Sequence, residues 1–142
     1  MSYSLAFSQA ILTVLYIADK MRHGISDFVP TKQLAEDLNI AAPSAVKILQ
    51  SLGGAGIIET REGAKGGVRL AIPPSNIRAL DVFNALEKGR PLFRFDLGLQ
   101  ITGEKPTRAQ QEISALLTSA EEAMKDKLNQ VTVEYLLEKL NQ

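Results

Sequence analysis

Two short helices joined by a tight turn, with a glycine-rich hairpin directly behind them, constrain this chain most. Thr31 predicts the N-cap of a helix over 32–38, because its hydroxyl can accept a hydrogen bond from an unpaired N–H in the first helical turn. After a short turn, Pro43 suits the first turn of the next helix, which the Gly53–Gly54 pair is expected to end. The spacing is that of a helix-turn-helix.

Two apolar runs behind the second of these helices predict the strands of a small hairpin. They cover 56–60 and 68–72, and the loop between them, 61–67, holds three glycines. A helix over 5–22, ended by Gly24, comes before the helix-turn-helix and carries an apolar face. This order is that of a winged helix-turn-helix, whose third helix can enter the DNA major groove while the hairpin touches the flanking backbone.

The rest of the chain predicts further helices separated by a linker. The remaining elements are an extended piece at 28–30, a helix over 78–88, a linker, a long helix that Thr107 caps and that runs to about residue 130, and a short helix that Thr132 caps. We therefore expect a mainly α fold with a small β wing, divided into a winged helix-turn-helix DNA-binding domain at 1–90, a linker at 91–106 and dimerisation helices at 107–142.

The third helix offers polar side chains toward a major groove. Ser44, Lys47 and Gln50 fall between its apolar positions, so they face outward, and no acidic residue that would repel phosphate occurs from 39 to 58. Lysine can pair with guanine acceptors, and serine can serve as donor or acceptor. Outside the context of a helix-turn-helix and a wing, the same face would be an ordinary solvated helix surface.

The hairpin loop is basic and rich in glycine. Between 61 and 69 it carries Arg61, Lys65 and Arg69 against the single acid Glu62, and its glycines permit backbone N–H groups to approach a phosphate. A plain turn without DNA contact stays open as an alternative, since turns favour glycine for conformational reasons alone. The residues predicted to contact DNA are Thr31, Lys32, Pro43, Ser44, Lys47, Gln50, Arg61, Lys65, Gly66, Gly67 and Arg69.

The charge balance and the missing residue types limit the possible functions. Lys and Arg number 16 and Asp and Glu number 16, so any basic footprint for DNA must be local, and a winged helix used only for protein interaction remains the alternative. Cysteine is absent and His23 is the only histidine, which excludes a thiolate nucleophile and cysteine-ligated zinc or iron–sulfur clusters. No paired carboxylates stand on a recognisable catalytic scaffold, so we expect no enzyme, no metal site and no cofactor, although carboxylates alone could still hold a hard cation.

The apolar stretch near the start predicts a core helix and no membrane anchor. Residues 5–18 are fewer than the about 20 apolar residues that a membrane span needs. A signal peptide carries Lys or Arg before its apolar run, and no Lys or Arg precedes this one. We therefore expect a cytoplasmic protein.

Four sequence motifs are shared with one known family. The chain reads TKQLA at 31–35, ILQSL at 48–52, AGII at 55–58 and REGAKGGVRLA at 61–71. A paired glycine at this spacing after a helix-turn-helix is uncommon. On these motifs the chain resembles the Rrf-two family of bacterial transcription regulators, closely over 1–90 and loosely in the C-terminal helices.

The resemblance implies a homodimer that binds a partly palindromic operator, and we expect it to act as a repressor. Several family members sense through an iron–sulfur cluster held by three cysteines between the fourth helix and the long helix. No Cys or His occurs from 90 to 106, so this chain resembles the cysteine-free branch, whose members respond to partner proteins or small molecules. The expected partners are double-stranded DNA, a second copy of the chain and an unidentified effector, for which a pocket near Phe93 and Phe95 is one candidate.

The long helix carries an apolar face that a winged domain cannot cover. At 1.5 Å per residue, about 24 residues span about 36 Å. Uncovered leucines would form an exposed apolar patch, which monomeric proteins rarely keep. Pairing with the same helix of a second chain removes the patch and sets two recognition helices toward half-sites about one helical turn apart. The residues predicted for this interface are Ile113, Leu116, Leu117, Ala120, Met124 and Leu128.

Overall fold

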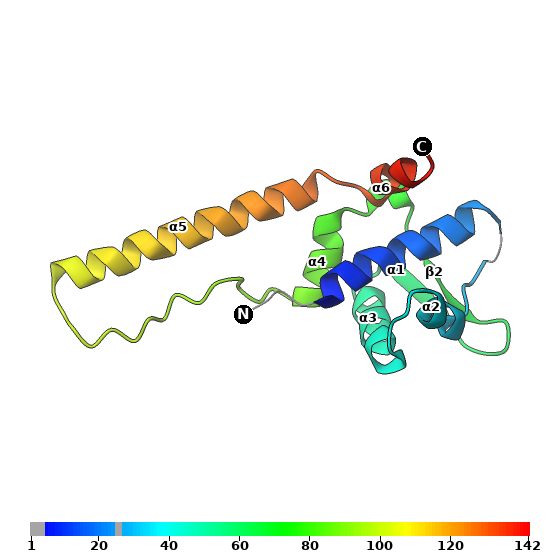
Figure 1. Cartoon of the computed structure of the whole chain (residues 1–142), viewed down its shortest axis with the longest axis horizontal. Helices are drawn as coiled ribbons and strands as arrows, with labels where there is room; N and C mark the ends of the chain where they lie inside the picture. The colour runs from blue at the N-terminus through cyan, green and yellow to red at the C-terminus, as the bar shows by residue number, and fades with distance from the viewer. Residues whose placement is uncertain (1–4, 25–26) are drawn as a thin grey trace.

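Helices and one small hairpin make up most of the chain, which a computed structural model describes at residues 5–24 and 27–142 (Figure 1). In chain order the elements are α1 (Leu5–Arg22), α2 (Thr31–Asp37), α3 (Ala42–Gly54), β1 (Ile58–Arg61), β2 (Gly67–Leu70), the 3-10 turn η1 (Pro74–Asn76), α4 (Ala79–Glu87), α5 (Glu104–Asn129) and α6 (Val133–Leu140). The predicted class, mainly α with a small β wing, is confirmed.

The core lies around α1, which runs through the middle of the body with α3 on one side and α6 on the other (Figure 1). Val14 and Ile17 of α1 are fully buried, because residues three apart lie on one face of a helix. Leu34 of α2 and Leu52 of α3 belong to the same buried cluster. The predicted bounds of this first helix are confirmed, and Gly24 follows it with a left-handed φ of +66°.

The wing is an antiparallel hairpin in which Ile58 of β1 lies opposite Leu70 of β2. The predicted strands, 56–60 and 68–72, are shifted by one or two residues away from the hairpin tip relative to β1 and β2. They differ because Gly56, with φ of +77°, still belongs to the turn that leaves α3. At the other end, β2 ends at Leu70, and the chain continues to Pro73 and to Pro74, the first residue of η1.

The extended piece before α2 adds a third strand-like contact to the wing. The Val29 N–H donates to the Val68 carbonyl at 2.8 Å, and the Val68 N–H donates to the Val29 carbonyl at 2.9 Å. Both valine side chains are buried. This confirms the predicted extended conformation at 28–30 and ties the wing to the start of the helix-turn-helix.

The helix-turn-helix has the predicted helices with different ends. Thr31 is the first residue of α2 and not its cap, because the carbonyl of Pro30 accepts the Leu34 N–H at 3.0 Å and no side chain caps the helix. α3 runs through the glycine pair that was predicted to stop it and ends at Gly54. The left-handed conformation that turns the chain falls two residues later, at Gly56.

The long helix begins three residues before the predicted cap. α5 starts at Glu104 after Gly103, which has φ of +131°. Thr107 therefore lies inside the first turn, where its hydroxyl donates to the Gly103 carbonyl at 2.9 Å. Its predicted role as the cap was wrong, because Pro106 is tolerated within the first turn of a helix and does not delay the start.

The last helix packs back on the body. Thr132 caps α6 as predicted, since its hydroxyl accepts a backbone N–H of the first turn at 3.0 Å. Val133 and Leu137 are buried in the same cluster as α1. α6 thus shares the core of the winged helix, and the predicted division into 1–90, a linker and 107–142 stays a prediction.

α5 and the segment 91–103 that leads to it project from the body (Figure 1). Near the body, the buried Leu92 donates its N–H to the Glu121 carboxylate at 2.7 Å, and this hydrogen bond holds the pKa of Glu121 below its usual value. At the C-terminal end of α5, the Arg78 guanidinium donates to the Asn129 carbonyl at 2.7 Å. No residue of α5 is buried. Among the described residues, no helix combines the length and the apolar content needed to cross a membrane.

Candidate nucleic-acid interface

α3 presents a polar face opposite a buried one. Lys47 and Gln50 lie on the outer face and are exposed, as is Pro43 one turn before Lys47. Ser44 is also exposed, and Ser44 and Lys47 both line a hollow that α3 shares with α1 and α4. The residues that hold the opposite face in the core are Ala45, Ile48, Leu49 and Leu52.

The turn between α2 and α3 is tight because its residues are small or tolerate an unusual backbone. Asn39 adopts the left-handed region with φ of +54°, which asparagine accepts more readily than most residues. The Ile40 N–H donates to the Ala35 carbonyl at 2.9 Å and closes the turn. Ala35, Ile40 and Ala45 form a small buried cluster, so the two helices approach closely.

A hydrogen bond from Tyr16 links α1 to the end of α2. The tyrosine hydroxyl donates to the Asp37 carboxylate at 2.5 Å. Burial, this hydrogen bond and the negative charge of Asp37 together raise the pKa of Tyr16 to about 12. Tyr16 therefore stays protonated, and able to donate, throughout the neutral pH range.

Both wing arginines lie against the aromatic ring of Phe28, which no sequence pattern indicated. The guanidinium carbon of Arg69 lies 4.6 Å from the centre of the Phe28 ring, and that of Arg61 lies 5.5 Å from it. Arg69 also forms an ion pair with Glu59 on the neighbouring strand. The ring therefore positions both cations, while Lys65 stands exposed at the hairpin tip.

The paired glycines of the wing have a packing reason. A Cβ at Gly67, which has φ of +144°, would lie 2.0 Å from the Val29 carbonyl oxygen. A Cβ at Gly66 would lie 2.0 Å from the Arg61 carbonyl oxygen. Gly67 is buried. Packing explains both glycines, and their predicted contact with DNA stays a prediction.

The predicted DNA-contacting residues come together on one side of the body. α2, α3 and the wing lie away from α5 and α6 (Figure 1). Lys32 is exposed and Thr31 is half-buried at the start of α2, and both line a hollow shared with the first turns of α3. α2, which carries Lys32, and the wing, which carries Arg61 and Lys65, thus lie beside α3 on this side of the body.

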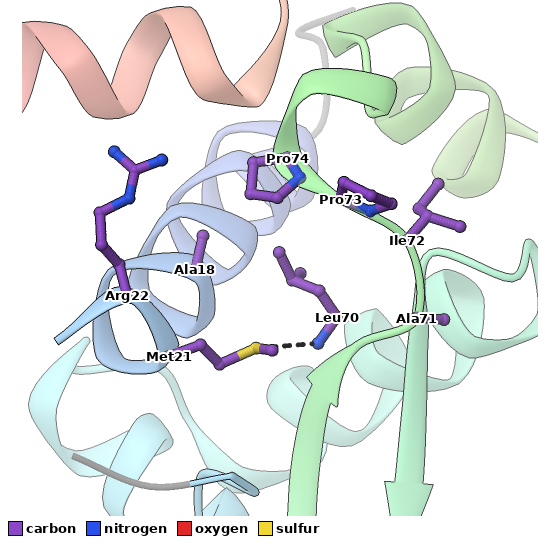
Figure 2. A pocket seen from close by; sticks show the side chains of 8 residues that line it. All are labelled: Ala18, Met21, Arg22, Leu70, Ala71, Ile72, Pro73 and Pro74. Carbon is purple, nitrogen blue, oxygen red and sulfur yellow. Dashed lines mark hydrogen bonds between the residues drawn. The ribbon is translucent and has the colours of Figure 1, made fainter. Parts of the chain in front are cut away.

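A separate hollow of about 460 Å³ lies where β2 leaves the wing (Figure 2). Apolar side chains of α1 and of the segment after β2 line it, including Met21, whose sulfur accepts the Leu70 N–H at 3.3 Å. Arg22 stands at its edge and forms an ion pair with Glu134 of α6. A small apolar molecule has room here, next to the base of the wing, and the predicted effector pocket near Phe93 stays a prediction.

Comparison with known proteins agrees with this geometry. The sequence model of the Rrf2 family, described as an iron-dependent transcriptional regulator, matches residues 3–139. The chain belongs to the Rrf2 family of transcriptional regulators. Its relatives are transcriptional regulators by name.

One curated relative and two solved structures illustrate the similarity. Over 74 residues the chain is 35% identical to the HTH-type transcriptional regulator NsrR of Shouchella clausii (strain KSM-K16), a match of 52% of this chain and 48% of that protein. The matched region thus spans about half the length of that relative. CymR (YrzC), the global cysteine regulator of B. subtilis, is 22% identical, with a TM-score of 0.71 and coverage of 98% of both chains. A structure from Lactobacillus plantarum is 24% identical, with a TM-score of 0.77 and coverage of 97% of this chain and 91% of that one. These two show the shared fold.

The iron of the family description does not fit the side chains of this Rrf2 protein. Thiolates are the usual ligands of an iron–sulfur cluster, and the sequence has no cysteine and a single histidine. Within residues 5–24 and 27–142, no group of three or more His, Asp and Glu side chains could hold a metal ion. We therefore assign no iron-dependent step to this chain.

Proposed function

We propose that this Rrf2 protein is a cytoplasmic, homodimeric repressor that binds a partly palindromic operator in a sequence-specific manner. The observation that carries the proposal is the outer face of α3. Pro43, Lys47 and Gln50 stand exposed along it, and no acidic residue occurs between 39 and 58. Polar and cationic side chains on a recognition helix can contact the base edges in the major groove.

The proposed homodimer rests on the apolar surface of α5. With 26 residues, α5 is about 39 Å long at 1.5 Å per residue. Leu116 is 66% exposed and Ile113 is 38% exposed, although both lie on the apolar face of the helix. The segment before α5 adds Leu97, Leu99 and Ile101, which are also exposed. A second copy of the chain would cover this surface, which monomeric proteins rarely keep exposed.

A mobility-shift assay against the region upstream of the chain's own gene tests the proposal. Sequence-specific binding predicts a discrete complex that survives an excess of unrelated DNA. Transcription in vitro from the same fragment then separates repression from activation. A protein that binds all fragments equally, or none, would contradict sequence-specific regulation.

Lys47→Ala is expected to weaken binding to the best operator by about 1–3 kcal/mol and to relax the preference at one base position, because lysine reads guanine acceptors in the groove. The measurement is operator selection followed by titration. The matched control is Lys139→Ala on α6, which lies on the other side of α1 from α3 (Figure 1). An unchanged selected motif for Lys47→Ala would count against this assignment.

Lys65→Ala is expected to weaken binding to all sequences about equally and to flatten the salt dependence by about one unit of slope, because a wing-tip cation contacts phosphate and not base edges. Affinity measured across a salt series on operator and on unrelated DNA checks this. A changed sequence preference with an unchanged salt slope would show that Lys65 reads bases.

A winged-helix module for protein interaction is the second candidate. It is favoured by the net charge of zero and by Arg69, whose charge Glu59 already offsets within the wing. Under this alternative Lys47→Ala and Lys65→Ala would leave DNA binding unchanged, because there would be no specific binding to lose. The same variants therefore discriminate the two candidates.

A further inference from the structure

The recognition helix carries an exposed apolar side chain among its polar ones. Val46, in the first half of α3, is 47% exposed. Ala42, one turn earlier, and Ala41 before the helix are exposed as well. Lys47, the predicted base-contacting residue, is the next residue after Val46. Val46 lines the hollow toward α2, whereas Lys47 lines a hollow toward α1 and α4, so α3 presents an apolar side chain on one flank and a cation on the other.

Val46 borders a hollow of about 760 Å³ between α2 and the first turns of α3. Apolar side chains form most of its lining, including Ile40 and the alanines at 41, 42 and 45. Thr31 and Lys32, at the start of α2, border the opposite side. The hollow thus lies between a side chain expected on the DNA backbone and the helix expected in the groove.

The charges around the hollow favour an uncharged occupant. Glu36 of α2 also borders it, and its carboxylate would repel a phosphate placed inside. Lys32 offers a cation for a phosphate at the outer edge instead. A base edge that lies inward from the backbone is then the part of a duplex that can reach the apolar lining.

Only one group on a base edge in the major groove is apolar, the C5-methyl group of thymine. We propose that Val46 and the alanine-lined hollow beside it bind a thymine methyl group in each operator half-site, which makes Val46 a specificity-determining residue. The inference rests on the proposed sequence-specific binding of DNA. It adds an apolar readout to the polar readout by Lys47.

Replacing thymine by deoxyuridine tests the inference, since this change removes the methyl group and leaves base pairing intact. The operator selected by the wild-type protein is synthesised with deoxyuridine at one thymine position of each half-site at a time. We expect one position at which affinity falls about fourfold per half-site, the factor for one buried methyl group. The other thymine positions serve as internal controls.

Val46→Ser supplies the second arm of the experiment. This variant should bind the thymine and the deoxyuridine operators equally, and its selected motif should lose the preference for thymine at that position. Thermal unfolding confirms that the variant is folded, as expected for a half-exposed residue. Two outcomes overturn the inference and leave the proposed function standing. In one, the wild-type protein binds its operator specifically but no deoxyuridine substitution lowers its affinity. In the other, Val46→Ser still binds the deoxyuridine operator more weakly than the thymine operator. If no operator is bound specifically, the proposed function fails and the inference with it.

Discussion

Leu116→Asp is expected to sediment as a monomer and to bind the operator about 10²–10⁴-fold more weakly than the wild-type protein. Within one chain the Leu116 side chain is 66% exposed, so an aspartate there loses little packing. In the proposed dimer the same position lies in the α5 seam, where an unpaired buried charge costs about 3–5 kcal/mol. The two-fold axis places one such charge from each chain in the interface. A monomer contacts only one of the two operator half-sites, so its affinity for the operator falls.

A charge on the opposite side of the same helix is the control for this variant. Ala115 is exposed and lies about half a turn from the apolar face, so Ala115→Asp should remain dimeric and bind normally. Sedimentation at tens of micromolar and circular dichroism separate dissociation from unfolding. A wild-type protein that sediments as a monomer at these concentrations would remove the basis of the proposed homodimer.

Gly67→Ala is expected to destabilise the fold by at least about 3 kcal/mol, which lowers the melting temperature by roughly 10 °C. The added Cβ would lie 2.0 Å from the Val29 carbonyl oxygen, and the glycine has φ of +144°, where other residues are strained. Relief would require breaking the paired hydrogen bonds between Val29 and Val68. The loss should therefore appear as unfolding and not only as weaker DNA binding.

Substitutions at two other glycines separate backbone strain from steric overlap as causes of the lost stability. Gly63 has φ of +103°, and its added Cβ would meet nothing among the described residues within 4 Å, so Gly63→Ala isolates backbone strain. Gly54 ends α3 and has neither a positive φ nor a near neighbour, so Gly54→Ala should be neutral or stabilise by about 0.5–1 kcal/mol. Thermal melts that ranked Gly67→Ala no worse than Gly63→Ala would contradict the packing account.

The order of the elements and the exposed face of the recognition helix could be predicted from the sequence, because the signals are local. Apolar residues at helical spacing define the buried stripe of α3, and the opposite face, with Lys47 and Gln50, follows by geometry. Pro43 in the first turn and the glycines of the wing loop likewise report on the backbone at their own positions. Helix ends were less accurate, as with Thr31 and Thr107, because a residue caps a helix only when its own backbone lies just outside it, and both threonines lie inside the first turn.

Only the tertiary structure decided which distant segments meet. The Val29 carbonyl lies against Gly67 and leaves no room for a Cβ there, a packing reason for glycine that the sequence does not reveal. Phe28 showed no pattern of its own, yet it holds Arg61 and Arg69 together. Leu137 of the last helix is buried in the same cluster as residues of α1, more than 100 positions earlier in the chain. Sequence periodicity describes one element at a time, whereas each of these contacts joins elements far apart in the chain and depends on how the elements pack.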